Sequence, residues 1–196
     1  MPNITVNRLK ITGPKFEIQK CINSMDNKKG NIFDLNKIIQ MPYEIENKKL
    51  EDSSDEDSIL KLRQIIVANR KNKKRCKLAK EFLKAYEKPQ WYQWAIQNWG
   101  TRNTVDATGK WLNDDHFEYI IDTPWNAPVE AIYKLAQKYP SLSFTMESIE
   151  PIRGSAIILK CQNGQQVEKN DYCSRNKIYK KLLKDILKIN PAEFEN

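Results

Sequence analysis

Segments that alternate every two residues follow one another along this chain with segments that repeat every 3.6 residues, and their order limits the folds that it can adopt. The clearest alternation lies at 141–146, where every second residue is apolar, as in a half-buried strand (Leu142, Phe144 and Met146). Apolar residues at helical spacing predict amphipathic helices at about 14–26 and 129–136. The sequence therefore predicts a fold that combines strands with helices.

The order of these segments favours one topology. Strands are predicted at 4–12, 32–35, 117–122 and 142–146, and a further strand at 156–159 is predicted to turn back through Asn163-Gly164. Without the residues between the second and third strands, the order is β-α-β-β-α-β followed by an extra hairpin. This order matches the split βαβ, or ferredoxin-like, topology, in which two helices cover one face of an antiparallel sheet. We therefore predict an α+β fold of this kind.

Composition divides the chain further. The stretch from Glu44 to Asp57 contains seven acids against two lysines and predicts a flexible linker. Several helical stripes follow at 58–105 and predict a helical insertion. The predicted core is thus 1–57 with its acidic linker and 106–170, and residues 171–196 contain a C-terminal helix with a lysine-rich outer face.

Three of the five tryptophans lie in one short segment at 91–101, WYQWAIQNWGT. Residues three and four apart are neighbours on a helix, and Gly100 supplies a left-handed residue that ends one. A cluster of tryptophans marks either a packed junction or a recognition surface. We favour the junction, with Trp94, Trp99 and Trp125 mostly buried where the insertion meets the sheet.

A concentration of positive charge follows the acidic linker. The whole chain has a formal charge of +8, and residues 61–88 alone contain eleven Lys/Arg against two acids. Such an excess permits binding to nucleic acid or to an acidic protein, although the neighbouring acids could simply neutralise it. Four cations between two helical stripes are the predicted contact loop: Lys71, Lys73, Lys74 and Arg75.

Several chemical classes find little support. No apolar run approaches the length of a membrane span, the N-terminus has no secretory pattern, and the four cysteines form no C-x-x-C pair. We expect no cofactor and no metal, because the chain has a single histidine and no phosphate-cradling glycine spacing. Only Asp114-Asp115-His116 places acids beside that histidine, and a solvated turn is the favoured interpretation there.

A resemblance adds to these patterns. The chain resembles the YubB-type, ferredoxin-like family encoded on bacterial plasmids and phages, and four blocks carry the likeness in order: Asn7-Arg8-Leu9 with Gly13, residues 33–42, Asn98-Trp99-Gly100-Thr101, and Thr123-Pro124-Trp125 with Pro128. Where the family has another tryptophan soon after Asn98-Trp99-Gly100-Thr101, this chain has Arg102-Asn103-Thr104. The resemblance implies the fold and a mobile-element origin, and it implies no catalytic residue.

Two functional hypotheses follow. The first is a non-enzymatic binding protein in the bacterial cytoplasm, which engages nucleic acid, a host protein or a ribonucleoprotein and inhibits a defence system such as CRISPR or restriction. Its predicted contact residues are the four cations of the loop at 71–75 together with Trp99 and Arg102. The alternative is a nucleic-acid-processing enzyme with its site near Asp114, Asp115 and His116.

Overall fold

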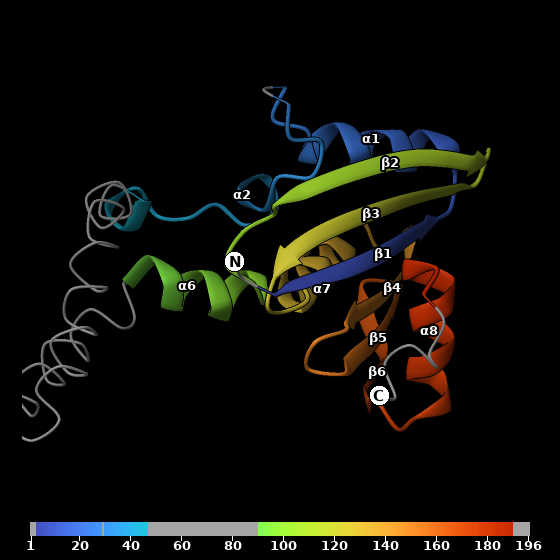
Figure 1. Ribbon diagram of the computed structural model, residues 1–196. Helices are drawn as coiled ribbons and strands as arrows, with labels where there is room; N and C mark the ends of the chain where they lie inside the picture. The colour runs from blue at the N-terminus through green and yellow to red at the C-terminus, as the bar shows by residue number, and fades with distance from the viewer. Residues whose placement is uncertain (1–2, 29, 47–89, 190–196) are drawn as a thin grey trace, which may run out of the picture. The chain divides into compact units, whose positions relative to one another are not determined.

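The computed structural model describes residues 3–28, 30–46 and 90–189. The chain divides into two compact units, residues 1–40 with 96–196 and residues 41–95. The first unit contains a six-stranded antiparallel sheet in the order β2-β3-β1-β4-β5-β6 (Figure 1). The predicted α+β class is confirmed, and the sheet has more strands than the four of the predicted core.

The strands that build this sheet come mostly from the C-terminal two thirds of the chain. They are β1 (Ile4–Thr12), β2 (Asp106–Asn113), β3 (His116–Pro124), β4 (Ser143–Glu150), β5 (Ser155–Gln162) and β6 (Gln165–Cys173). Strand β1 lies in the middle and pairs with β3 on one side and β4 on the other. The predicted strands at 4–12, 117–122 and 142–146 and the hairpin through Asn163-Gly164 are confirmed.

Helices cover both faces of the sheet. Helices α1 (Lys15–Met25) and α7 (Val129–Lys138) lie on one face, and α8 (Lys177–Leu187) lies on the other, against the β4–β6 end (Figure 1). Two further helices are α2 (Leu35–Ile38) and α6 (Gln90–Trp99). The helices predicted at 14–26 and 129–136, and the C-terminal helix, are confirmed within a few residues.

The face beneath α1 and α7 is the main core. Buried residues alternate along β1, so that Leu9 and Ile11 point to this face with no exposed surface. Neighbouring strands add Tyr119 and Phe144, and α1 adds Ile18. Burying such side chains stabilises the fold by about 1.5–3 kcal/mol each before the entropy of ordering them is subtracted.

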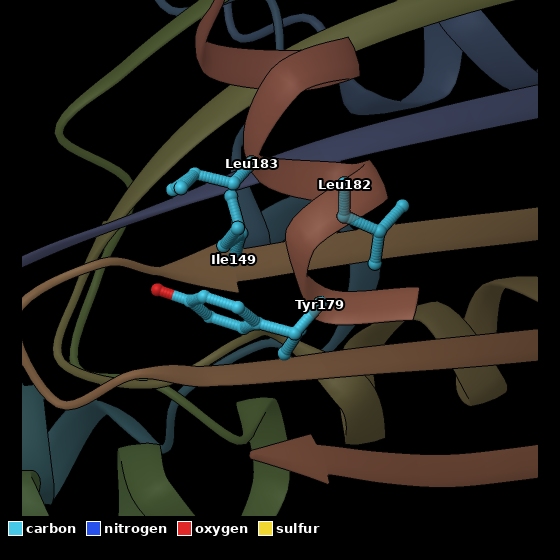
Figure 2. Packing of buried hydrophobic residues seen from close by; sticks show 5 residues of the cluster. Ile149, Tyr179, Leu182 and Leu183 are labelled. Atoms are coloured by element: carbon cyan, nitrogen blue, oxygen red, sulfur yellow. The ribbon is translucent and has the colours of Figure 1, made fainter. Parts of the chain in front are cut away.

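The opposite face has a smaller core beneath α8. Figure 2 shows Tyr179, Leu182 and Leu183 of this helix around Ile149 of β4, and Ala156 of β5 completes the cluster. Asn176 begins the helix, because its side chain accepts the backbone N–H of Ile178 (2.8 Å). The amphipathic spacing of the sequence therefore docks α8 by its apolar stripe and leaves the lysines outward.

The strand predicted at 32–35 is wrong, because this segment turns into α2. The side chain of Asn31 accepts the backbone N–H of Phe33 (3.0 Å), and that of Asp34 accepts the N–H of Asn36 (2.9 Å). These local side-chain bonds compete with a sheet ladder and start a helix. Phe33 remains buried and meets the Tyr119 ring edge-on, with centroids 5.2 Å apart.

The strand that the prediction missed is β2. It is an edge strand with mostly exposed residues, so it lacks the alternation that identifies a buried strand. Gly109 interrupts its pattern for a steric reason, because a Cβ there would lie 2.7 Å from the Phe117 ring. The structure thus has a strand at 106–113 and none at 32–35.

The tryptophan junction is only partly correct. Trp99 is 5% exposed, and its indole N–H donates to the Ile39 carbonyl (2.8 Å). Trp94 is half-buried, whereas Trp125 is 40% exposed, so the expectation of a buried Trp125 is wrong. Of the predicted insertion at 58–105, residues 58–89 lie outside the described residues. Among the described helices, none is long and apolar enough to cross a membrane.

Candidate functional site

A cleft lies over the α7-covered face at one end of the sheet, with a volume of about 240 Å³. Its floor is the sheet itself, and its other walls are the turn that follows β3, the start of α7 and the end of α6. The lining residues that carry polar side chains are Thr5, Asn126, Glu130, Ser148, Glu150, Arg153, Ser155 and Lys169, with Trp125 beside them.

Two hydroxyl groups on the floor have no hydrogen-bond partner within the part of the chain that the structure describes. Thr5 is 3% exposed and Ser148 is 1% exposed, yet neither Thr5 Oγ1 nor Ser148 Oγ finds a donor or acceptor. A buried polar group without a partner costs about 1–3 kcal/mol. Since both residues line the cleft, a group that enters it could supply the missing hydrogen bonds.

A polar network lies behind these hydroxyls. Asn7 is fully buried, and its Nδ2 donates to the carbonyls of Thr5 (3.1 Å) and Ile121 (2.8 Å) and to Thr123 Oγ1 (2.9 Å). Pairing of the strands places Asn7 directly opposite Ser148 on β4. Register therefore holds the polar floor in position across three strands.

The rim of the cleft carries an aromatic ring and a cation. Trp125 has a φ of +68°, a left-handed conformation that is uncommon for a bulky residue. Its indole lies beneath the Arg153 guanidinium, 4.9 Å from the ring centroid. Because Trp125 is also 40% exposed, this stacked pair is open to a ligand.

The carboxylate of Glu150 sets the shape of the loop that carries Arg153. Glu150 is 2% exposed, and its two oxygens accept the backbone N–H groups of Ile152 (3.1 Å) and Arg153 (2.6 Å). Its negative charge also contributes, after burial, to a raised pKa of the Tyr179 hydroxyl. Lys169 of β6 adds an exposed cation to the same cleft.

Two of the tryptophan-containing blocks meet at this cleft. Gly100 has a φ of +85°, and a Cβ there would lie 2.9 Å from both the Ala127 carbonyl oxygen and the Val129 nitrogen. Thr101 is fully buried and donates its hydroxyl hydrogen to the Pro124 carbonyl (3.2 Å). Close approach that only glycine allows therefore brings the end of α6 against the start of α7.

A second surface feature lies on the outer face of α8. Lys177, Lys181, Lys184 and Lys188 are all exposed. The first three are spaced by four and three residues, which aligns them along one side of the helix, and Lys188 follows as its C-cap. At a rise of 1.5 Å per residue, the helical part of the row is about 10 Å long. Among the described residues, no ion pair engages Lys177, Lys181 or Lys184.

Of the predicted contact residues, the structure describes Trp99 and Arg102. Lys71, Lys73, Lys74 and Arg75 lie outside the described residues. Trp99 is buried with its N–H bonded, an arrangement that favours a packing role over a contact role. Arg102 is half-buried, and its Nε donates to the neighbouring Asn103 side chain (3.2 Å).

The acids beside the single histidine lie at the exposed turn between β2 and β3. Asp115 Oδ1 is 2.6 Å from His116 Nδ1, and Asp114 pairs with Lys15 at 2.7 Å. The hydrogen bond and charge of Lys15 lower the pKa of Asp114. Each group is thus occupied and solvated, as predicted for a turn, and the described residues contain no cluster of three or more metal-ligating side chains.

Buried thiols offer no nucleophile at neutral pH in this part of the chain. Burial raises the pKa of the Cys21 thiol to about 12, and it also raises the pKa of Cys161. A thiol with such a pKa stays protonated near pH 7 and is a poor nucleophile.

The residues of the cleft gave almost no signal in the sequence. Thr5 and Ser148 are separated by most of the chain, and only the register of β1 with β4 brings them to one floor. The left-handed conformation of Trp125 gives no signal in the sequence. Arg153 lies in a short connection whose link to that turn depends on tertiary structure.

Comparisons with known proteins add little. No protein-family model and no curated protein matches the sequence. Among solved structures, the chain is similar to the crystal structure of protein api92 from Yersinia pseudotuberculosis, described with the family model DUF1281. The two share 10% identity and a TM-score of 0.44, over 88% of this chain and 98% of that one. At this level the likeness carries no property of that protein over to this chain.

Proposed function

We propose that this chain is a non-enzymatic binding protein that contacts nucleic acid through the lysine row of α8, defined as Lys177, Lys181, Lys184 and Lys188. The observation that carries the proposal is an aligned row of exposed ammonium groups without bound carboxylates among the described residues. Lysine is a flexible point charge that binds phosphates without fixed geometry. A regular row of such charges fits a polyphosphate backbone.

The overall charge supports the same partner. A formal charge of +8 increases the rate at which a polyanion meets the surface, and α8 gives that charge a place on a firmly packed element. An acidic protein is the competing partner. It would favour arginine, which binds carboxylates in a bidentate manner, whereas this row contains only lysine.

The test is a titration of duplex DNA at several salt concentrations. Each engaged cation contributes about −0.9 to the slope of log affinity against log salt. A variant with Lys177, Lys181 and Lys184 changed to Gln should therefore lose roughly 2.7 units of slope on that relation. Lys188 is left unchanged, because it forms the left-handed C-cap of α8.

The matched control removes the same number of charges elsewhere. Lys20, Lys37 and Lys134 are exposed on α1, α2 and α7, away from α8, and their change to Gln lowers the net charge equally. The proposal requires that the control keeps the parent slope within about one unit, set by a single phosphate contact. Equal losses in both variants, or no binding by the parent, would contradict it.

The finer parts of the proposal rest on other support. A ferredoxin-like core is supported by the order β1-α1-β2-β3-α7-β4, which remains when α2 and α6 between α1 and β2 are set aside, and by the place of β1 between β3 and β4. A bacterial, mobile-element origin and a role against CRISPR or restriction are supported only by the family resemblance. Expression of the chain in cells under phage challenge, with defence scored by plaque counts, would test that role.

The cations at 71–75 remain a separate predicted contact. Changing Lys71, Lys73, Lys74 and Arg75 to Ala should reduce the salt slope by roughly 3 to 4 if all four meet duplex phosphates. Because this loop and α8 are changed by different variants, the two titrations tell the two contacts apart.

A further inference from the structure

We propose that the cleft between the Trp125 turn and the β4–β5 end of the sheet binds a nucleobase, presented either by a free nucleotide or by an unpaired strand. This inference concerns a site different from the lysine row of α8 and does not depend on it. The argument rests on the unpartnered hydroxyls of the floor, the stacked pair at the rim, and the size of the cleft.

The floor requires a ligand with hydrogen-bonding groups along one edge. Thr5 Oγ1 and Ser148 Oγ are buried without partners, and each hydroxyl can donate one hydrogen bond and accept others. A purely apolar ligand would leave both unsatisfied. A nucleobase carries donors and acceptors in its own plane, so it can bond to both groups at once.

The rim requires a flat ligand. The guanidinium of Arg153 lies over the Trp125 ring, 4.9 Å from its centroid, and Trp125 as a residue is 40% exposed. Bases of nucleic acids stack on aromatic rings and on guanidinium planes alike. A base can therefore extend this stack from either side while its edge points to the floor.

The size and charge of the cleft limit further which ligands fit it. A volume of about 240 Å³ lies below the range of roughly 300–1,000 Å³ of pockets that enclose drug-sized ligands. It suits a single base, with the sugar and phosphate left outside. Lys169 and Arg153 lie at the same cleft and can meet that phosphate, while Glu150 is an acceptor for an amino group of the base.

Calorimetric titration of the full chain with the four ribonucleoside monophosphates tests the inference, with ribose 5-phosphate as the ligand that has no base. At least one nucleotide should bind, and ribose 5-phosphate should bind much more weakly. Equal binding of ribose 5-phosphate would overturn the inference, because the cleft would then be a simple anion site.

Variants connect the binding to the cleft. Stacking on one aromatic side chain accounts for about a 5- to 150-fold change in affinity, so Trp125→Ala should weaken nucleotide binding by that factor. Phe16→Ala removes a 76% exposed aromatic ring on α1 and should leave binding unchanged. Circular dichroism should show both variants folded, because neither side chain is buried.

The two sources of a base are separated by a second set of ligands. Short single strands that bind at least tenfold more tightly than nucleotides, and that lose this binding in Trp125→Ala, would assign the cleft to unpaired strands. Comparable affinities would assign it to free nucleotides. If neither nucleotides nor single strands respond to Trp125→Ala, the inference is overturned, and a polar peptide side chain becomes the better ligand.

The α8 variant keeps this result independent of the proposed function. Changing Lys177, Lys181 and Lys184 to Gln should leave the affinity for nucleotides unchanged, because the lysine row and the cleft lie on opposite faces of the sheet. Loss of duplex binding without loss of nucleotide binding would support both sites separately. Loss of nucleotide binding in this variant would contradict the placement in the cleft.

Discussion

In both halves of β1, every second side chain points to the sheet face that α1 and α7 cover, and these side chains are equally buried. Those of the N-terminal half are polar, and those of the C-terminal half are apolar. Leu9 and Ile11 have no exposed surface and join the apolar core, whereas Thr5 and Asn7 are 3% and 0% exposed and hold the polar floor of the cleft. The apolar side chains of the C-terminal half are satisfied by packing alone. The polar atoms of the N-terminal half require hydrogen-bond partners, and some have none among the described residues. Burial alone therefore does not separate a stabilising region from a binding one, whereas the partners of the buried atoms do.

The largest expected effect lies on the packing side of this comparison. Trp99→Ala should lower the free energy of unfolding by about 3–5 kcal/mol, because it removes a buried aromatic side chain and its hydrogen bond to Ile39. Urea unfolding followed by circular dichroism measures the change. Trp99→Phe keeps most of the volume and should recover more than half of the loss. A loss below ~1 kcal/mol in Trp99→Ala would remove the packing role.

The next largest effect is expected for Leu9→Ala. It should lower the free energy of unfolding by about 2–5 kcal/mol, because removal of a fully buried leucine side chain from the central strand leaves a cavity. Affinity for nucleotides should stay at the parent value. The matched control is Leu112→Ala on the edge strand β2, where the side chain is 50% exposed and little stability should be lost. Equal losses at both positions would contradict the division of β1 into two halves.

Asn7→Ala should lower the free energy of unfolding by less, about 1–3 kcal/mol. The change deprives buried acceptors of their donor but removes little apolar surface. Thermal unfolding is a suitable measurement. Asn170→Ala changes an exposed amide on β6 and should be close to neutral. A neutral Asn7→Ala would show that the polar network contributes nothing to the fold.

A smaller effect on stability is expected at Asp122 of β3, which points to the opposite face of the sheet. Burial, and then the charge of Asp106 opposite on β2, raise the pKa of Asp122. The folded state therefore binds this proton more tightly than the unfolded state does. The resulting stability is present below the unfolded pKa and is lost as pH rises through the folded pKa. Asp122→Asn should raise the free energy of unfolding at neutral pH by less than about 1 kcal/mol and flatten its pH dependence above the usual Asp range.

The spacing of apolar residues predicted those helices and strands that bury one face. The alternation at 141–146 identified β4, and the spacing of apolar residues identified α8 with its outward lysines. Asp34 was misinterpreted because a capping side chain and a strand residue look alike without their partners. Strand β2 was missed because an exposed edge strand has no buried face to impose a period of two.

The candidate cleft depended on information that no local pattern contains. Thr5 and Ser148 meet through the register of two strands that are far apart in sequence. The exposure of Trp125 follows from a left-handed backbone within a turn that contains two prolines, and tryptophan itself gives no sign of that conformation. The tryptophans therefore predicted a packed junction, but the prediction that Trp125 is buried in it was wrong.

The central claim, that the unpartnered hydroxyls of Thr5 and Ser148 serve binding and add nothing to stability, is tested most directly by the double variant Thr5→Val/Ser148→Ala. Both changes keep the approximate shape of the floor and remove the unpartnered hydroxyls. The free energy of unfolding in urea and the affinity for nucleotides should be measured on the same preparation. We expect stability to be unchanged or to rise by about 1 kcal/mol, because two unsatisfied buried groups are gone, while nucleotide affinity falls at least tenfold. A loss of stability as large as that of Asn7→Ala, with nucleotide affinity unchanged, would contradict the account.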